Sequence, residues 1–373
     1  MRVVVVIPTY NENENIKMLV PKLMEQFKNL PTHDMHILVV DGNSPDGTGE
    51  AVLALSEKYP NVHLLLEIEK AGLGAAYIYG FKHAMKELNA EVLVEMDGDF
   101  QHDPKDLTKM LAAFDEGFDY VIGSRYIKGG SVPKEWALYR KLLSVGGNIF
   151  SKYVLGIFDV NDFTTGFKLS RVKGFVDKID LDDINSAGFA YKIDWLFRMH
   201  RLGAKIKEVP IRFGLRDRGD SKMEKDNMLD SLKVVVLLRY QENKSFFKFG
   251  AVGVVGLFVD SGLFSILRIT SLGSATASAM SGLIGMLTTF TLNNIWSFNE
   301  RKLTGMKKKV VSFVVYCVSS YIPIIFRSWL IDFSIIKFGD SAFVAYTSFF
   351  IGIAVGLIWN YTVYSRLIWK KSS

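Results

Sequence analysis

The sequence predicts an α/β domain with a mostly parallel sheet, followed by an all-α domain of membrane-spanning helices. Short apolar runs alternate with helical patterns over residues 1–225, which is typical of a doubly wound sheet. From Phe246 the composition changes to long apolar segments, each of about 20 residues, which is enough to cross a bilayer. The whole chain of 373 residues is 49% hydrophobic, and its mean hydropathy is +0.17. We therefore expect a soluble half joined to a membrane half.

Apolar runs in the first half are predicted to be strands, with helices between them. The first of these helices is expected from about residue 14 to 29, where apolar residues recur at helical spacing. Polar residues follow each predicted strand, and ligands bind at the carboxyl ends of the strands in open α/β sheets. The predicted strands are residues 3–7, 37–40, 62–66, 92–96 and 118–122.

Several classes of protein are excluded. No G-x-G-x-x-G follows the first strand and there is no Walker P-loop, so neither a dinucleotide dehydrogenase nor a P-loop kinase fits. The only cysteine, Cys317, excludes a disulfide framework and a cysteine-based zinc site. The N-terminus lacks the features of a signal peptide, so we expect it in the cytoplasm. Much of the net charge of +6 lies beside apolar segments, which favours lipid over nucleic acid as the partner.

An acidic cluster follows the fourth predicted strand, in the stretch L-V-E-M-D-G-D-F-Q-H-D-P at 93–104. Asp97, Asp99 and Gln101 stand at alternate positions, and Pro104 is expected to open the next helix. Oxygen ligands in this pattern suit Mg²⁺ or Mn²⁺. A D-x-D sequence alone is more often a solvated turn. Polar residues at the other strand ends favour a ligand site instead.

Motifs at these strand ends resemble the GT-A domain of family 2 glycosyltransferases. They are P-T-Y-N-E at 8–12, V-D-G-N-S-P-D-G-T at 40–48, K-A-G-L-G-A-A at 70–76 and M-D-G-D-F-Q-H-D-P at 96–104.

Later motifs resemble the polyprenyl-phosphate glycosyltransferases, and most closely the dolichol-phosphate mannose synthases. They are G-S-R at 123–125, T-T-G-F-K at 164–168, A-Y-K-I-D at 190–194 and R-G-D-S-K-M at 218–223. The resemblance covers nearly all of residues 1–225. One departure changes the charge, because the family more often has a second acid where Gly42 stands.

The resemblance implies transfer of mannose from GDP-mannose to dolichyl or polyprenyl monophosphate, with inversion at the sugar carbon. It implies a Mg²⁺ or Mn²⁺ site at Asp97, Asp99 and Gln101, with Asp99 and Gln101 as direct ligands and Asp97 beside either the ribose or the metal. The cation would neutralise the charge of the leaving diphosphate. Arg218 and Lys222 are expected to close over the diphosphate. The residues expected to contact the nucleotide sugar are Pro8, Tyr10, Glu12, Asp41, Lys70, Gly72, Asp97, Asp99, Arg218 and Lys222.

Arg125, Arg140 and Ser144 are predicted to bind the acceptor phosphate, and Arg125 is also counted among the catalytic residues. Arg140 and Ser144 are four residues apart and therefore share a helix face. The second pKa of a phosphate monoester is about 6, so the acceptor is already largely a dianion and no strong general base is required. His102 is interpreted as a polar residue near the start of the next helix.

Amphipathic and apolar segments indicate how the chain meets the membrane. A helix at about 134–157 is predicted to lie on an anionic membrane surface, with an ordinary helix packed on the sheet as the alternative. Residues 226–245 are expected to form a second amphipathic interface helix or linker. Residues 246–373 are predicted to form a transmembrane domain of four helices, near 246–267, 273–296, 310–336 and 342–364.

Basic residues between the second and third spans and after the fourth place the catalytic domain and both termini in the cytoplasm. A weak internal echo between residues 293–297 and 360–365 predicts two tandem helical hairpins.

Other functions remain open from the sequence. The same motifs fit a glucosyltransferase that uses UDP-glucose and polyprenyl phosphate. A lipid-flipping membrane domain with a regulatory nucleotide-binding domain is a second alternative, and a nucleotide sensor is a third. No protein partner is implied.

Overall fold

The computed structural model describes residues 1–67, 71–215, 225–269 and 274–370. The chain divides into two units, Met1–Arg239 and Tyr240–Ser373. This division falls within residues 226–245, which the sequence predicts as an interface helix or linker between the two domains. Helix α7 (Lys225–Glu242) buries Val234, Val235 and Leu238 in the core of the first unit.

The first unit is built on a sheet of seven strands in the order β3-β2-β1-β4-β6-β5-β7. All neighbouring strands are parallel except β6, which runs antiparallel to both β4 and β5. The predicted α/β class with a mostly parallel sheet is confirmed. The strands are β1 (Arg2–Thr9), β2 (Asp34–Asp41), β3 (Val62–Leu66), β4 (Val92–Glu95), β5 (Tyr120–Ser124), β6 (Lys168–Arg171) and β7 (Ile206–Pro210).

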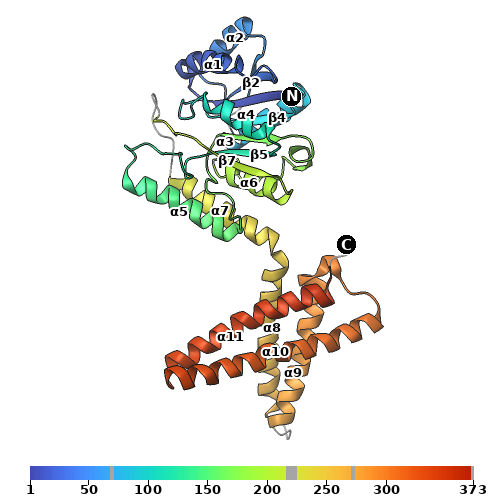
Figure 1. The fold of residues 1–373 in the computed structure, drawn as a ribbon. Coiled ribbons are helices and arrows are strands. Elements are labelled where there is room, and N and C mark those ends of the chain that lie inside the picture. Colours follow the sequence, from blue (N-terminus) through green and yellow to red (C-terminus); the bar gives the residue numbers. More distant parts are fainter. Residues whose placement is uncertain (68–70, 216–224, 270–273, 371–373) are drawn as a thin grey trace. The chain divides into compact units, whose positions relative to one another are not determined.

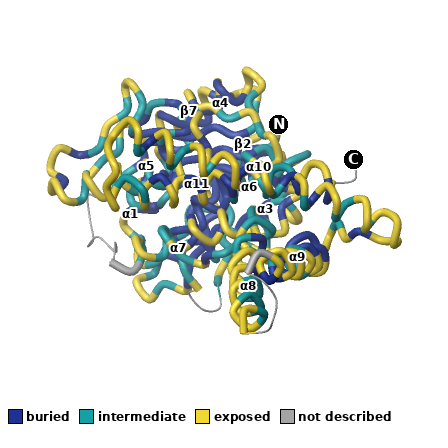
Figure 2. The backbone as a smooth tube through the Cα atoms, turned by 90° about the horizontal axis from the view of Figure 1, so that it is seen from below, coloured by how far each residue is buried: buried dark blue, intermediate teal, exposed yellow. Residues whose placement is uncertain are grey.

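Helices cover both faces of this sheet (Figure 1). Alternate residues of β1 enter two different cores, with Val4 and Val6 on one face and Val3 and Val5 on the other. Burial on both faces explains why this strand is an unbroken apolar run. Figure 2 marks buried residues in dark blue, and most residues of β2 are among them. The helices are α1 (Asn13–Phe27), α2 (Thr48–Lys58), α3 (Leu73–Lys86), α4 (Asp106–Asp115), α5 (Leu138–Leu155) and α6 (Tyr191–Arg201), with a 3₁₀ turn at Val176–Lys178.

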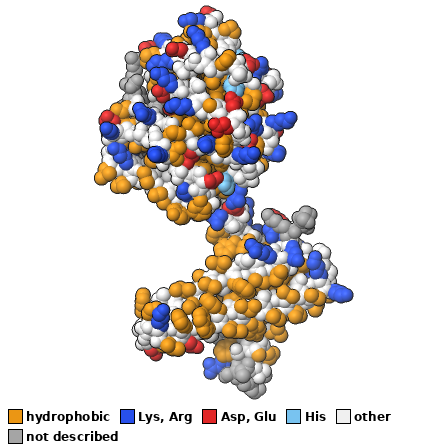
Figure 3. Space-filling view, viewed as in Figure 1, with side chains coloured by type: hydrophobic (Ala, Val, Ile, Leu, Met, Phe, Trp, Pro, Cys, Tyr) orange, Lys and Arg blue, Asp and Glu red, His pale blue; other side chains and the backbone are white. Residues whose placement is uncertain are grey.

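The second unit contains two pairs of packed helices. Helix α8 (Lys244–Leu267) packs on α9 (Ser274–Leu292), and α10 (Met306–Phe338) packs on α11 (Ala342–Val363). Figure 3 shows hydrophobic side chains spread over the surface of this unit. Three described helices are long and apolar enough to cross a membrane, namely α8, α10 and the continuous helix Ala342–Ile368. Helix α9 is not among them, so the four predicted spans stay a prediction.

A π-helical turn follows each of these pairs, at Asn293–Ser297 and at Tyr364–Ile368. A short 3₁₀ helix, Asn299–Arg301, comes after the first turn. The residues directly after the two turns, Phe298 and Trp369, stack with ring centroids 4.7 Å apart. Asn294 Oδ1 also accepts a hydrogen bond from Trp369 Nε1 at 3.0 Å. These contacts join the corresponding ends of the two helix pairs.

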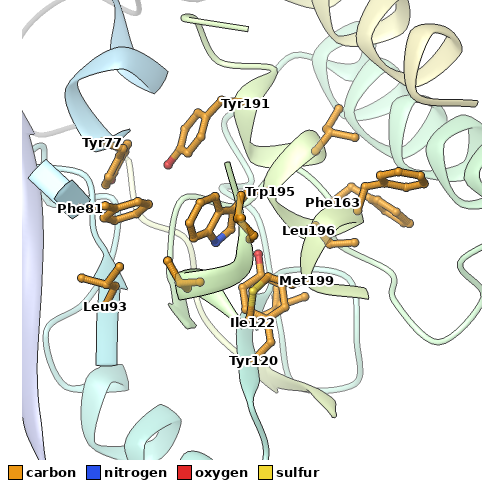
Figure 4. Close-up of a cluster of buried hydrophobic side chains, with 14 of the residues drawn as sticks. Tyr77, Phe81, Leu93, Tyr120, Ile122, Phe163, Tyr191, Trp195, Leu196 and Met199 are labelled. Atoms are coloured by element: carbon orange, nitrogen blue, oxygen red, sulfur yellow. The ribbon is translucent and has the colours of Figure 1, made fainter. Parts of the chain in front are cut away.

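Trp195 of α6 is the largest fully buried side chain of the first unit, and it packs tilted against Phe81 with ring centroids 5.0 Å apart (Figure 4). Its Nε1 donates to Ser170 Oγ at 3.0 Å. We expect Trp195→Ala to destabilise the first unit by about 3–5 kcal/mol, because it leaves a cavity and an unpaired hydroxyl. Thermal unfolding of the full-length protein in detergent measures this. Trp195→Phe, which keeps an aromatic ring, should lose much less stability. Equal melting temperatures for Trp195→Ala and the unaltered protein would contradict this packing.

Candidate active site

Several of the predicted site residues lie at one edge of the sheet. Strands β1, β2 and β4 are parallel, and their register pairs Thr9 with Asp41 and Val6 with Glu95. Their carboxyl ends therefore lie side by side. The loops that carry Tyr10, Asp41 and Asp97 leave the sheet at this edge, as the sequence predicted.

Asp41 is buried at the end of β2. Its Oδ1 accepts hydrogen bonds from Thr9 Oγ1 at 2.9 Å and from Ser44 Oγ at 2.6 Å, and its Oδ2 accepts from the Ser44 amide at 2.9 Å. The carboxylate thus fixes the turn after β2 to the end of β1. Glu12 is anchored in a similar way, because its Oε2 accepts from Asn15 Nδ2 at 2.6 Å.

A second carboxylate does lie beside Gly42, although it comes from another strand. A Cβ added to Gly42 would be 3.4 Å from Glu67 Oε2 and 3.4 Å from the ring of Tyr10. The Glu67 amide donates to the carbonyl of Asp41 at 2.9 Å, which holds the end of β3 against the end of β2. Sequence reasoning missed Glu67, although an acid directly after a predicted strand was a signal for it.

Gly72 is required by its surroundings. Its φ is +115°, and an added Cβ would lie 2.6 Å from the carbonyl oxygen of Ala187. The loop before α3 therefore packs against the backbone at 187–188. The predicted donor-binding residues Lys70, Arg218 and Lys222 lie outside the residues that the structure describes.

The acidic loop after β4 is held in an uncommon conformation. Phe100 has a φ of +61°, a left-handed value that bulky residues rarely adopt. Asp99 Oδ1 accepts from the Gln101 amide at 3.1 Å. The Gln101 side chain donates through Nε2 to the carbonyl of Gly214 at 3.3 Å, and Gly214 returns a backbone bond of 2.8 Å to Gln101. The side-chain nitrogen of Gln101 is thus engaged by the protein backbone, which sets the direction of its side-chain oxygen.

Asp97 is fixed through both of its oxygens. Tyr77 Oη donates to Oδ1 at 3.0 Å, and Lys192 Nζ lies 3.2 Å from Oδ2. Burial alone would raise the pKa of Asp97, but Lys192, then His102 and Tyr77, outweigh it and hold the pKa below its ordinary value. Asp97 is therefore a carboxylate at neutral pH. Each of its oxygens keeps a further lone pair for a cation.

His102 is buried, which was not predicted. It lies just before α4 and packs edge-to-face on Phe167 and Phe213, with ring centroids 5.3 and 5.2 Å away. Its Nε2 is 3.7 Å from Asp97 Oδ2. Burial lowers the pKa of His102 to about 4. The ring is therefore neutral at pH 7 and is not an imidazolium that could act as a general acid.

The donor atoms in the acidic loop fit a hard divalent cation. Asp97, Asp99 and Gln101 supply only oxygen, which Mg²⁺ and Mn²⁺ prefer. The described part of the chain contains no group of three or more His, Cys, Asp or Glu side chains that could hold a metal ion. A cation here would therefore depend on the Gln101 amide and on oxygens of a ligand as well as on the two carboxylates.

Arg125, at the end of β5, is held by a buried aspartate that the sequence reasoning missed. Its Nε and Nη2 donate to the two oxygens of Asp162 at 2.8 and 2.7 Å, and Nη2 also donates to Thr164 Oγ1 at 2.8 Å. Burial would lower the pKa of Arg125, but Asp162 more than reverses this and raises it. The guanidinium is thus fixed and permanently charged.

Helix α5 carries Arg140 and Ser144, and Ser144 contacts the residue that follows Arg125. Ser144 Oγ accepts from the hydroxyl of Tyr126, the residue after Arg125, at 2.6 Å. The Arg140 guanidinium lies 4.0 Å from the ring centroid of Trp136. Burial lowers the pKa of Arg140, and the nearby positive charge of Arg125 lowers it further. An anion bound between the two guanidinium groups would relieve this repulsion.

Comparison with known proteins shows which family the chain belongs to. Residues 4–176 match the family described as glycosyl transferase family 2, and residues 248–369 match the GtrA/DPMS transmembrane domain. The chain is 33% identical to a dolichol-phosphate mannosyltransferase of Pyrococcus furiosus over 336 residues, which is 89% of this chain and 91% of the relative. The chain belongs to the polyprenyl-phosphate mannosyltransferases of glycosyl transferase family 2.

Two bacterial relatives match about three fifths of the chain. A polyprenol monophosphomannose synthase of Mycolicibacterium smegmatis is 40% identical over 232 residues, covering 62% of this chain and 84% of the relative. An undecaprenyl-phosphate mannosyltransferase of Micrococcus luteus is 41% identical over 223 residues, covering 60% and 88%. This glycosyltransferase is also an integral membrane protein, because it carries the transmembrane domain of the family and apolar helices long enough to span a bilayer.

Loss of the Asp162 carboxylate should destabilise the fold. We expect Asp162→Ala to cost about 3–5 kcal/mol, because it leaves Arg125 buried without its counter-charge. The drop in the thermal unfolding temperature of the full-length protein measures this. The double variant Arg125→Met with Asp162→Leu removes both charges and should recover part of the loss. If the double variant is instead less stable than Asp162→Ala, the two residues are not coupled as described.

Proposed function

We propose that the protein transfers mannose from GDP-mannose to a dolichyl or polyprenyl monophosphate and releases GDP, with inversion at the sugar carbon. The observation that carries this proposal is the pairing of two opposite electrostatic features at one sheet edge. The oxygen-rich loop of Asp97, Asp99 and Gln101 suits a cation with a diphosphate, and the guanidinium pair of Arg125 and Arg140 suits a second phosphate. The names of the relatives support the same reaction.

Asp97, Asp99 and Gln101 would hold Mg²⁺ or Mn²⁺, which would neutralise the charge that builds on the departing GDP. The protein's own part is to hold these oxygens in place before the donor arrives. Tyr77 and Lys192 fix Asp97, and the Gly214 carbonyl fixes Gln101. Arg218 and Lys222, which lie outside the described residues, are proposed to bind the diphosphate from the other side.

The nucleotide is proposed to lie along the ends of β1, β2 and β3. Pro8, Tyr10, Glu12, Asp41, Lys70 and Gly72 would line it, with Glu67 beside Gly42. Guanine presents two adjacent N–H donors on its Watson–Crick edge, whereas uracil presents one. Carboxylates only accept hydrogen bonds when ionised, so acids at these strand ends favour guanine.

Arg125, Arg140 and Ser144 are proposed to bind the phosphate of the lipid acceptor. A phosphate monoester is largely a dianion at neutral pH, so it can attack the sugar carbon without losing a proton to the protein. This agrees with the chemistry of the site, since His102 is neutral and buried and need not act as a base. Asp162 acts through Arg125 by fixing its orientation.

Helix α5 is proposed to rest on the cytoplasmic face of the membrane. Large apolar side chains of this helix are exposed, and exposed apolar residues on a basic helix are typical of membrane contact. These exposed residues are Leu138, Tyr139, Leu142, Leu143, Ile149 and Tyr153. Such a placement would let a phosphate on a lipid reach Arg125 and Arg140 without leaving the bilayer.

The experiment that tests this proposal compares two acids of the same loop. Asp99→Ala should lower mannosyl transfer from GDP-mannose to a short-chain polyprenyl phosphate by about 100-fold or more, because it removes a ligand of the charge-neutralising cation. Asp103→Asn is the matched control. Asp103 is exposed and its Oδ1 only accepts from the Lys105 amide at 3.0 Å, so transfer should be nearly unchanged. Near-normal transfer by Asp99→Ala would show that the site assignment is wrong.

A further inference from the structure

Lys192 is a buried lysine beside Asp97 of the acidic loop, with 1% of its side chain exposed. It belongs to the A-Y-K-I-D motif at the start of α6, for which the sequence suggested no role. Its Nζ lies 3.2 Å from Asp97 Oδ2 and 4.8 Å from the ring centroid of Phe189. A buried ammonium carries a large desolvation cost unless it is paired, so a specific partner is required.

Gly166 of the T-T-G-F-K motif leaves the space in which this ion pair forms. A Cβ added to Gly166 would collide with both Lys192 Nζ and Asp97 Oδ2. The flanking residue Phe167 is buried and packs against His102, so the loop cannot simply move outward. Absence of a side chain at residue 166 is therefore a condition for the contact between Lys192 and Asp97.

A second set of buried polar groups holds the backbone and the neighbours of Lys192 in place. Lys168 Nζ donates to the carbonyl of Lys192 at 2.7 Å. Tyr191 Oη donates to Glu95 Oε2 at 2.5 Å, and its ring stacks on Tyr77 with centroids 5.2 Å apart. Tyr77 and Tyr191 lie next to each other in Figure 4. The start of α6 is thus locked to β4 and β6, and the direction of the Lys192 side chain is fixed with it.

We propose that Lys192 is a positioning residue for the cation site, which holds the Asp97 carboxylate in its binding orientation through an ion pair that only glycine at position 166 allows. The inference rests on the proposed function, since it assumes that Asp97 binds a divalent cation. Lys192 Nζ contacts the Asp97 carboxylate, so its effect on the reaction is proposed to pass through that group.

Two physical effects of Lys192 oppose each other, and the geometry decides between them. Its positive charge repels a nearby cation, which would weaken metal binding. It also holds the orientation of Asp97 in a site where only 24% of the aspartate side chain is exposed. Groups that orient metal ligands change metal affinity by about 10- to 100-fold when removed. Oδ2 keeps a second lone pair that Lys192 does not use, so the oxygen can bind a cation while it accepts from the lysine. We therefore expect the loss of orientation to weaken cation binding more than the loss of repulsion strengthens it.

The test measures Mn²⁺ binding to the full-length protein in detergent with excess GDP, by electron paramagnetic resonance of free Mn²⁺. We expect Lys192→Met to weaken Mn²⁺ binding by about tenfold or more. Lys192→Arg, which keeps the charge, should bind Mn²⁺ with an affinity closer to that of the unaltered protein. Gly166→Ala keeps the lysine but separates the pair, so it should weaken binding to a similar degree. Thermal unfolding without Mn²⁺ establishes that each variant is folded.

Gly80→Ala is the matched control for crowding. A Cβ there would meet Val6 Cγ1 at 2.6 Å and Val40 Cγ2 at 2.8 Å, both apolar and away from the ion pair. It should lower the melting temperature and leave Mn²⁺ affinity unchanged. Unchanged or tighter Mn²⁺ binding by folded Lys192→Met or Gly166→Ala would overturn the inference alone. Failure of the unaltered protein to bind Mn²⁺ would overturn the proposed metal site and the inference together.

Discussion

A carboxylate that stays ionised at the end of a buried strand is the constraint around which the first unit is arranged. Asp97 needs partners because water reaches little of it, and those partners come from separate parts of the chain: Tyr77 from α3 and Lys192 from α6. The loop at Gly166 must pass close to the pair without a side chain. Motifs that are far apart in the sequence are thus tied together by one electrostatic requirement.

A second buried ion pair, between Arg125 and Asp162, has the positive group at the strand end in place of the negative one. Arg125 is a buried cation held by Asp162, and burial together with the charge of Arg125 lowers the pKa of Arg140 on α5. We propose that the fixed carboxylate serves a cation and that the two guanidinium groups serve an anion. Transfer between a diphosphate donor and a phosphate acceptor needs both of these in one place.

The sequence predicted the α/β class, the early strands and the strand ends that form the site, because apolar runs followed by polar residues report local structure directly. It could not predict β6, since a short antiparallel strand such as Lys168–Arg171 depends on pairing with both β4 and β5. Asp162 was missed for a related reason. It acts through a contact with Arg125, which is distant in the chain, and one sequence does not show such contacts.

The central claim is that this site transfers mannose to a lipid phosphate. The most direct measurement incubates the full-length protein with Mn²⁺, a polyprenyl phosphate and either radiolabelled GDP-mannose or radiolabelled UDP-glucose, and then counts label in the lipid extract. The account predicts label from GDP-mannose, dependent on both the metal and the acceptor. Label from UDP-glucose alone would contradict the assigned donor, and no lipid-extractable label from either sugar would contradict the reaction itself.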